Sequence, residues 1–316
     1  MTRRLQLAAL PTPIEPLHRL SDRLGVELRV KRDDLTGLLV SGNKVRKLEF
    51  LLAEALELGA DTLITCGGAG SNHCRATAVI AARLGLGCRL LLRTPEGLPE
   101  PKPWTGNLLL SSLAGAELRF VTPDAYRDHE GLFGAAVAEL EAAGHRPYVV
   151  PEGGSNALGA EGYAAAFEEL LSQWPEADTV ISAMGSGGTA AGLVLGRRRV
   201  GRGPMPVAVN VCDDEEFFRA RIASILGDRA DHDLRILDGF KGRGYARSSP
   251  EELDLIADVA RTEGLFLDPV YTGKAFLGLM QTLASRPGDL GERVLFLHTG
   301  GVYGLFAEAD ALSRSR

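Results

Sequence analysis

The sequence lacks the features of a membrane protein and of a nucleic-acid-binding protein. No run of about 18 apolar residues occurs, so no transmembrane helix is expected. Lys and Arg total 35 against 41 Asp and Glu, and a net charge of −6 does not supply the basic face that nucleic acid or an anionic membrane requires. The first residues lead into Pro11 and Pro13 rather than into the apolar stretch of a signal peptide. We therefore expect a cytoplasmic protein that binds a small molecule, with neither nucleic acid nor membrane as a partner.

Cysteine and lysine are also scarce. The four cysteines have no C-x-x-C spacing and the six histidines include no H-E-x-x-H motif, so the sequence predicts neither a metal site nor a disulfide framework. Lysine accounts for only six of the 35 basic residues: Lys31, Lys44, Lys47, Lys102, Lys241 and Lys274. Any reaction that needs a lysine amine therefore has few candidates.

Short apolar runs alternate with helix-like stretches along most of the 316 residues, a pattern typical of an α/β fold with parallel sheets. Two units share the order strand, glycine-rich loop, helix, strand. Their predicted bounds are 61–65, 67–70, 71–84 and 88–92 for the first unit, and 178–182, 185–189, a helix to about residue 196 and 207–211 for the second. A further strand at 293–298 ends in Thr299-Gly300-Gly301. Because open α/β sheets bind ligands beyond the C-terminal ends of their strands, these loops predict the ligand crevice.

The loop Gly185-Ser186-Gly187-Gly188-Thr189 is a candidate phosphate site, because it offers backbone N–H groups, two hydroxyls and a helix N-terminus. A tight turn without a ligand is the plain alternative, but it would need less glycine. A dinucleotide site is the other alternative, since residues 185–190 fit G-x-G-x-x-A and Asp213 and Asp214 follow the next strand. An NAD-dependent oxidoreductase would not require the lysine and the further hydroxyl-lined loops of this chain.

Lys44 is the candidate nucleophile. It follows Ser41-Gly42-Asn43 and precedes a helix predicted over 49–58, with Arg46 and Lys47 close behind. Most lysines are solvated surface residues, but neighbouring positive charge favours the neutral amine. A reactive lysine together with a phosphate site fits a ligand that is both an aldehyde and a phosphate ester.

Eight motifs occur in a fixed order along nearly the whole chain. They are Lys31-Arg32-Asp33-Asp34, Gly42-Asn43-Lys44-Val45-Arg46-Lys47-Leu48-Glu49, Ser71-Asn72-His73, Gly153-Gly154-Ser155-Asn156-Ala157-Leu158-Gly159, Gly185-Ser186-Gly187-Gly188-Thr189, Gly244-Tyr245, Asp268-Pro269-Val270-Tyr271-Thr272-Gly273-Lys274 and His298-Thr299-Gly300-Gly301. Together they resemble the pyridoxal-phosphate enzymes of the D-cysteine desulfhydrase and 1-aminocyclopropane-1-carboxylate (ACC) deaminase family.

The resemblance implies pyridoxal 5′-phosphate as cofactor, a small amino acid as substrate and a homodimer. It implies the tryptophan-synthase-β-like α/β fold, with two open twisted sheets flanked by helices. A smaller α/β domain, residues 43–149, would be inserted into a larger cofactor-binding domain made of residues 1–42 and 150–316. Pro and Gly interrupt the chain at 95–105, which we expect to be a loop, and at 145–155, where we expect the chain to cross between the domains.

The same resemblance assigns roles to individual residues. Lys44 would hold the cofactor and move the proton at the substrate Cα, and residues 185–189 would bind the phosphate. Asn72 would bond to the ring hydroxyl of the cofactor, and the substrate carboxylate would dock at Ser71, Asn72 and His73, at a helix N-terminus suited to an anion. The expected catalytic residues are Lys44, Ser71, Tyr245 and Tyr271, and the expected cofactor-binding residues are Lys44, Asn72, Gly185, Ser186, Gly187, Gly188, Thr189 and Thr299.

Two threonines bear on the substrate. Members similar to ACC deaminase carry Glu where this chain has Thr272, and Thr299 matches the partner of the pyridine nitrogen in desulfhydrases. A neutral hydroxyl leaves the ring a weaker electron sink, which is adequate when a good leaving group departs from Cβ. Gly70, where Gln is common, and Cys74 depart from the family pattern and leave the substrate side chain and its chirality open. We expect Cys74 to be a packed thiol.

The leading expectation is therefore a pyridoxal-phosphate-dependent β-lyase that converts D-cysteine or a close analogue to pyruvate, ammonia and sulfide. Within the family, ACC deaminase is the first alternative. An L-cysteate sulfo-lyase, which would expel sulfite, is the second. An NAD-dependent oxidoreductase is the alternative from a different class.

Overall fold

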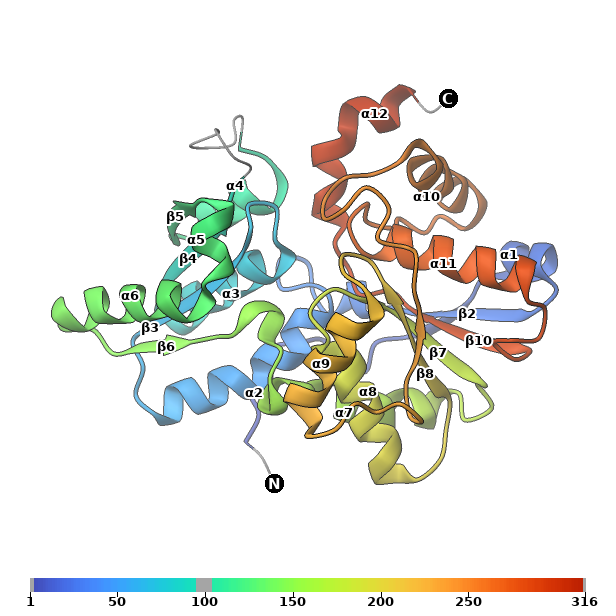
Figure 1. The fold of residues 1–316 in the computed structure, drawn as a ribbon, viewed down its shortest axis with the longest axis horizontal. Coiled ribbons are helices and arrows are strands. Elements are labelled where there is room, and N and C mark those ends of the chain that lie inside the picture. Colours follow the sequence, from blue (N-terminus) through green and yellow to red (C-terminus); the bar gives the residue numbers. More distant parts are fainter. Residues whose placement is uncertain (1–2, 95–103, 315–316) are drawn as a thin grey trace.

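The computed structural model describes residues 3–94 and 104–314, so the loop predicted at 95–105 lies largely outside the described residues. Two sheets lie side by side, each flanked by helices, and the chain passes from one to the other and back (Figure 1). The two-sheet α/β architecture predicted from the sequence is confirmed.

The larger sheet has six strands in the order β1-β2-β10-β7-β8-β9, and all neighbours are parallel except β1 and β2. The strand bounds are β1 (Ile14–Pro16), β2 (Glu27–Lys31), β7 (Thr179–Met184), β8 (Met205–Asn210), β9 (Arg235–Leu237) and β10 (Arg293–Leu297). One face is covered by α1 (His18–Leu24), α10 (Pro250–Glu263) and α11 (Thr272–Ser285), and the other by α7 (Ala157–Gln173), α8 (Gly188–Val200) and α9 (Glu215–Leu226). The chain ends in η3 (Val302–Glu308) and α12 (Ala309–Arg314).

The smaller sheet has four parallel strands in the order β5-β4-β3-β6. Their bounds are β3 (Thr62–Gly68), β4 (Gly87–Arg93), β5 (Glu117–Val121) and β6 (Pro147–Val149). On one face lie α2 (Asn43–Glu57), α3 (Asn72–Leu84) and α4 (Gly106–Leu113), and on the other α5 (Pro123–Arg127) and α6 (His129–Ala142). Because helices cover both faces, β3 is buried along its whole length, and its sequence is largely apolar and uncharged with no alternation of apolar and polar residues.

Both predicted strand-loop-helix-strand units are confirmed as β3-α3-β4 and β7-α8-β8, and the strand predicted at 293–298 is β10. The predicted helix at 49–58 is confirmed, but it begins six residues earlier, at Asn43. All four strands of the smaller sheet lie within residues 43–149, and all six of the larger sheet lie outside them. We propose that each sheet is the core of one domain, with the smaller domain inserted into the larger.

A network of buried charges joins α2 to the larger sheet. The Arg46 guanidinium donates to both carboxylate oxygens of Asp33 at 2.8 Å and to Glu169 at 2.9 Å, and Lys31 donates to Glu169 at 2.5 Å. Burial alone would raise the pKa of Asp33, but the Arg46 charge holds that pKa below its ordinary value. Two cations balance two carboxylates, as buried charges require. The network therefore fixes the first turn of α2, which carries Lys44, against β2 and α7.

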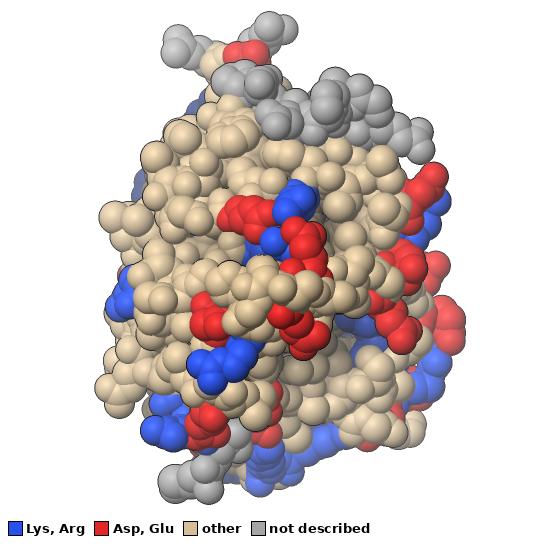
Figure 2. Space-filling model, turned by 90° about the vertical axis from the view of Figure 1, so that its left-hand side faces the viewer, with Lys and Arg blue, Asp and Glu red and all other residues tan. Residues whose placement is uncertain are grey.

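The surface of the part of the molecule built on the smaller sheet, here called the smaller lobe, carries charges of both signs. On the face shown in Figure 2, the Lys and Arg side chains of the described residues are interspersed with Asp and Glu instead of gathering into a basic patch. Among the helices that the structure describes, none is long and apolar enough to cross a bilayer.

Candidate active site

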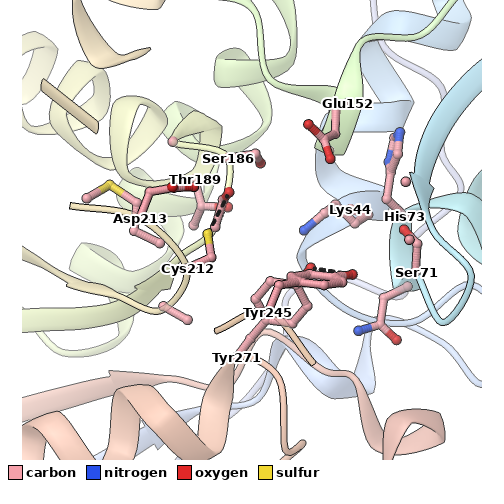
Figure 3. Close-up of a pocket in the computed structure, with 18 of the residues that line it drawn as sticks. Lys44, Ser71, His73, Glu152, Ser186, Thr189, Cys212, Asp213, Tyr245 and Tyr271 are labelled. Atoms are coloured by element: carbon pink, nitrogen blue, oxygen red, sulfur yellow. Dashed lines mark hydrogen bonds between the residues drawn. The ribbon is translucent and has the colours of Figure 1, made fainter. Parts of the chain in front are cut away.

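A cavity of about 470 Å³ opens between the two sheets, beyond the C-terminal ends of their strands. Eleven residues predicted from the sequence line it: Lys44, Ser71, Asn72, His73, Gly185, Ser186, Gly187, Thr189, Tyr245, Tyr271 and Thr299. In Figure 3 the labelled side chains converge from both lobes on one space. The remaining predicted residue, Gly188, does not line the cavity and packs against Lys47 and Ser155 behind it.

Lys44 enters the cavity from the first turn of α2 (Figure 3). The preceding Gly42 has φ +92°, and a Cβ there would lie 2.5 Å from the carbonyl oxygen of Thr299, so only glycine fits. The N–H of Asn43 donates to the same carbonyl at 3.1 Å, which ties the start of α2 to the loop that follows β10. Burial lowers the pKa of Lys44 to about 8, although the carboxylates of Asp268 and Glu152 oppose that shift. At pH 7 about a tenth of the Lys44 amines are therefore neutral, a far larger fraction than for an ordinary lysine.

The loop between β7 and α8 has the geometry of an anion site. Gly187 adopts the left-handed conformation, with φ +83°, and α8 begins at the next residue, so the first N–H groups of the helix have no partner within it. The hydroxyl of Thr189 accepts from the side chain of Asn43 at 3.0 Å, and the hydroxyls of Ser186 and Ser155 lie 2.8 Å apart. The loop thus presents N–H groups and hydroxyls beside Lys44.

Lys47 lies directly behind this loop and was missed as a site residue by sequence reasoning. Its side chain is 1% exposed, and its amine donates only to Gly153 O at 3.0 Å and Ser155 Oγ at 3.3 Å, with no carboxylate partner among the described residues. A Cβ at Gly188 would lie 2.8 Å from its amine nitrogen. Burial, and then the charge of Lys44, hold the pKa of Lys47 well below its ordinary value. A phosphate group in the loop would supply the missing negative charge.

Ser71, Asn72 and His73 form the N-terminal end of α3. Ser71 caps the helix, its hydroxyl accepting from the N–H of Cys74 at 3.2 Å. His73 Nε2 lies 2.8 Å from the Thr65 hydroxyl, which itself donates to Val150 O, so Nε2 is the donor of that pair. Burial lowers the pKa of His73 far below its ordinary value, so the imidazole is neutral. The anion-attracting feature of this wall is therefore the helix N-terminus and not a charged histidine.

Of the two threonines that bear on the substrate, only Thr299 lines the cavity. Thr272 is 1% exposed, and its hydroxyl donates to Asp268 and accepts from the Asp268 N–H, both at 2.7 Å. The Thr272 hydroxyl therefore does not face the cavity, because it is engaged with Asp268 in the turn before α11. Sequence position alone did not reveal this engagement.

Three further residues, Glu152, Tyr126 and Arg93, line the cavity and were not predicted from the sequence. Glu152 accepts a hydrogen bond from Tyr126 at 2.6 Å and lines the cavity, as Tyr126 does. The Arg93 guanidinium lies over the rings of Tyr126 and Tyr245, 5.0 and 5.3 Å from their centroids. Arg93 ends β4 beside Gly68, the last residue of β3. Its position at the C-terminal end of a parallel strand could therefore have identified it as a candidate site residue from the sequence.

The two departures from the family pattern do not crowd the cavity. Cys74 is 1% exposed and burial raises its pKa to about 12, which agrees with a packed thiol. A Cβ at Gly70 would meet no heavy atom within 4 Å, so packing does not require glycine there. Within the described ranges no group of three or more His, Cys, Asp or Glu side chains could hold a metal ion.

Comparison with known proteins gives one consistent family. Residues 5–300 match the model of the pyridoxal-phosphate-dependent enzymes. The chain is 43% identical to a putative ACC deaminase of Thermotoga maritima, over 98% of this chain and 99% of the relative. It is also 43% identical to the mitochondrial bifunctional D-cysteine desulfhydrase/ACC deaminase of Arabidopsis thaliana, over 97% of this chain and 80% of the relative. The solved structure of an ACC deaminase homologue superposes with a TM-score of 0.88 at 36% identity, covering 99% of this chain and 96% of the other.

The residues present fit pyridoxal phosphate. A lysine with a depressed pKa and an N–H-rich loop line one cavity, and directly behind that loop lies the buried amine of Lys47, which has no carboxylate partner among the described residues. This arrangement suits an aldehyde that carries a phosphate. The dinucleotide alternative has no comparable support. The chain belongs to the pyridoxal-phosphate-dependent ACC deaminase/D-cysteine desulfhydrase family.

Proposed function

We propose that this enzyme is a β-lyase that releases sulfide from D-cysteine or a close analogue, giving pyruvate and ammonia. The observation that carries the proposal is the neutral hydroxyl of Thr299 on the cavity wall, with no carboxylate at position 272 or 299. If Thr299 partners the pyridine nitrogen, no acidic side chain holds that nitrogen protonated. Such a ring suits the loss of a good leaving group from Cβ better than the opening of a cyclopropane ring.

Pyridoxal phosphate, when bound, supplies the electron sink for the charge that develops at the substrate Cα. Lys44 would hold the cofactor, and the loop 185–189 together with Lys47 would hold its phosphate. The N-terminal end of α3, with Ser71, would bind the substrate carboxylate. Asn72 would contact the ring oxygen. These assignments account for the convergence of both lobes on a single cavity.

Lys44 is the proposed proton carrier. With a pKa of about 8, its free amine can accept the Cα proton near neutral pH. The Cα–H and Cβ–S bonds then break, the electron pair of the latter leaves with sulfur, and HS⁻ departs. The remaining 2-aminoacrylate takes up water to give pyruvate and ammonia. Tyr245 and Tyr271, with pKa values raised by burial, would stay protonated and act as hydrogen-bond donors to the substrate or leaving group.

Two other substrates remain candidates within the same site. ACC deaminase activity is supported by the names of the relatives from Thermotoga maritima and Arabidopsis thaliana, the latter of which names both reactions. L-cysteate would use the same proton transfer and expel sulfite. Both alternatives keep the cofactor and the proposed role of Lys44, and differ in the bond that breaks.

A substrate panel tests the proposal. The enzyme is incubated with D-cysteine, L-cysteine, β-chloro-D-alanine, L-cysteate and ACC, and keto-acid formation is followed together with sulfide and sulfite. We expect D-cysteine and β-chloro-D-alanine to give pyruvate and ACC to give little or no 2-oxobutanoate. ACC as the best substrate would refute the threonine argument, and cysteate as the best would change the leaving group alone.

We further propose that the enzyme is a cytoplasmic homodimer. Large apolar side chains are exposed on the loop before α2, on α4 and on η3, among them Leu38 (81%), Leu113 (75%) and Phe306 (59%). The Tyr303 hydroxyl donates to Leu38 O at 3.1 Å, so that loop and η3 are adjacent. An exposed apolar surface of this kind favours burial against a second copy. Sedimentation of the protein and of Leu38→Ser tests this: the native chain should be dimeric and the variant shifted toward monomer.

A further inference from the structure

Asn107 connects the cavity residue Asn72 to a buried arginine. The Asn107 side-chain nitrogen donates to Asn72 Oδ1 and to Gly70 O, both at 2.8 Å. Its side-chain oxygen accepts from Nε of Arg75 at 3.1 Å. Asn107 belongs to α4, whereas the other three residues lie at or near the start of α3, so the contact is made between two helices.

The direction of each hydrogen bond follows from Arg75. A guanidinium has donors only, so the side-chain atom of Asn107 that faces it must be the oxygen. The amide nitrogen of Asn107 then faces Asn72 and donates to it. Since Asn72 Oδ1 accepts that bond, the remaining part of its amide, the Nδ2 group, is left without a partner among the described residues, and Asn72 lines the cavity.

Because Arg75 and Asn107 are buried, turning the side-chain amide of Asn107 over would be costly. Arg75 is 0% and Asn107 3% exposed. Arg75 is held in place by the carbonyl oxygens of Leu39 and Ser41 and by the ring of Tyr303, 5.2 Å from its guanidinium carbon. Burial lowers the pKa of Arg75 only to about 10, so it is charged at neutral pH. Turning Asn107 over would set its NH₂ group against the guanidinium and leave a buried donor unsatisfied.

We propose that Arg75 and Asn107 are positioning residues that fix the amide of Asn72 as a hydrogen-bond donor toward the ring oxygen of pyridoxal phosphate. This inference rests on the proposed role of Asn72 in cofactor binding. A donor at that oxygen stabilises its deprotonated form and lowers the pKa of the ring hydroxyl. An acceptor in its place would raise that pKa.

The substitution Asn107→Asp tests whether Asn107 sets the orientation of the Asn72 amide or only packs against it. The carboxylate is of nearly the same size and still accepts from Arg75, but it cannot donate to Asn72. Asn72 would therefore turn, donate to the carboxylate and present its oxygen to the cavity. Asn107→Leu removes the contact without imposing the reversed orientation. Ser111→Ala is the matched control, because Ser111 is buried on the same helix and its hydroxyl donates only to the Asn107 carbonyl among the described residues.

The readout is the pH titration of the visible absorption of the bound cofactor, measured without substrate. We expect Asn107→Asp to raise the apparent pKa of that absorption by about one pH unit or more. In this variant the hydrogen bond from Asn72 to the charged ring oxygen is replaced by a repulsive contact between two oxygens, and the loss of one such bond is worth at least that shift. Asn107→Leu should give a smaller rise, and Ser111→Ala none. A midpoint unchanged in Asn107→Asp with cofactor bound would overturn the proposal.

The dependence on Asn72 is tested by Asn72→Leu and by the double variant Asn72→Leu/Asn107→Leu. If Asn107 acts through Asn72, the single Asn72 variant raises the midpoint and the second substitution adds nothing. An additional shift in the double variant would contradict the inference. Because no substrate is present, a failure of the proposed β-lyase reaction leaves this test unaffected, whereas the absence of any cofactor absorption in the native protein would refute the proposed site itself.

Discussion

The hydroxyl of Tyr271 donates to that of Tyr245 at 3.3 Å, and the two rings meet edge to face with centroids 6.1 Å apart. Tyr271 lies at the start of α11, whereas Tyr245 lies in the loop before α10. Burial raises the pKa of Tyr245 to about 12 and raises that of Tyr271 as well. Both phenols are therefore protonated at neutral pH and face the cavity as a pair (Figure 3).

Replacing either phenol tests whether the pair acts on substrate. We expect Tyr245→Phe and Tyr271→Phe each to lower kcat on the order of 100-fold, because positioned proton donors contribute effects of this size. The affinity for pyridoxal phosphate should change much less. Steady-state kinetics and cofactor titration measure the two quantities separately, and an equal loss of both would identify the tyrosines as packing residues.

Lys274 anchors the loop that carries Tyr245. Its amine, on a side chain that is 0% exposed, donates to the carbonyl oxygens of Lys241 and Gly244, both at 2.8 Å. Gly244 has φ +106°, which glycine adopts readily, whereas Ala246 has φ +53°, which a residue with a Cβ rarely adopts unaided. Lys274 therefore links the position of Tyr245 to α11 and to Tyr271.

Lys274→Met should remove this anchor. We expect kcat to fall roughly 10- to 100-fold, because small displacements of a catalytic group lower the rate by about that factor. In a Tyr245→Phe background the same substitution should have little further effect, because the group that Lys274 positions is already lost. Full additivity of the two substitutions in kcat would show that Lys274 acts by another route.

The substitution Lys47→Met separates the effect of the buried amine on protein stability from its effect on cofactor binding. Without cofactor, the variant should be at least as stable as the native protein toward urea, because an amine without a carboxylate partner among the described residues is removed from the interior. With cofactor, it should bind roughly 10- to 100-fold more weakly, since a charge-assisted contact to phosphate is lost. The exposed Lys241→Met is the matched control and should change neither quantity. A native-like cofactor affinity in Lys47→Met would exclude Lys47 from the phosphate site.

The strands and glycine-rich loops can be predicted from the sequence because the local pattern determines them. A parallel strand covered on both faces is a short, uncharged and largely apolar run, as in β3 and β7, and glycine follows where the chain turns into a helix. Because the ends of such strands meet at one edge of a sheet, the pattern also predicts that the loop 185–189 lines a ligand crevice. The family resemblance supplies the remaining site residues, among them Asn72 and the two tyrosines.

Buried charge cannot be predicted in the same way. The polar first turn of α2, with Arg46 and Lys47, has the composition of a solvated surface, and the sequence pattern therefore predicts a helix that begins only at Glu49. Both side chains are buried by partners distant in the sequence: Glu169 lies 123 residues from Arg46, and Ser155 lies 108 residues from Lys47. The engagement of Thr272 with Asp268 and the contact of Asn107 with Asn72 likewise depend on tertiary packing.

The depressed pKa of Lys44 predicts how cofactor loading depends on pH. Only the neutral amine attacks an aldehyde, and the amine is protonated below its pKa of about 8 and neutral above it. The rate at which the apoprotein takes up pyridoxal phosphate should therefore rise with pH, with a midpoint near 8 instead of near the ordinary value of about 10.4. Stopped-flow absorbance at a series of pH values measures that rate. A midpoint above 10 would mean that Lys44 is not desolvated in the apoprotein.

The identity of the lysine that holds the cofactor is the central claim, and borohydride reduction followed by peptide mapping tests it most directly. Three lysines are almost completely buried, namely Lys31 on β2, Lys47 on α2 and Lys274 on α11. Of the five lysines that the structure describes, Lys44 alone lines the cavity. We predict one pyridoxyl adduct, on the peptide that contains Lys44, and its loss in Lys44→Ala together with turnover, while some cofactor still binds through the phosphate loop. An adduct on Lys47 or Lys274 with Lys44 unmodified would contradict the account.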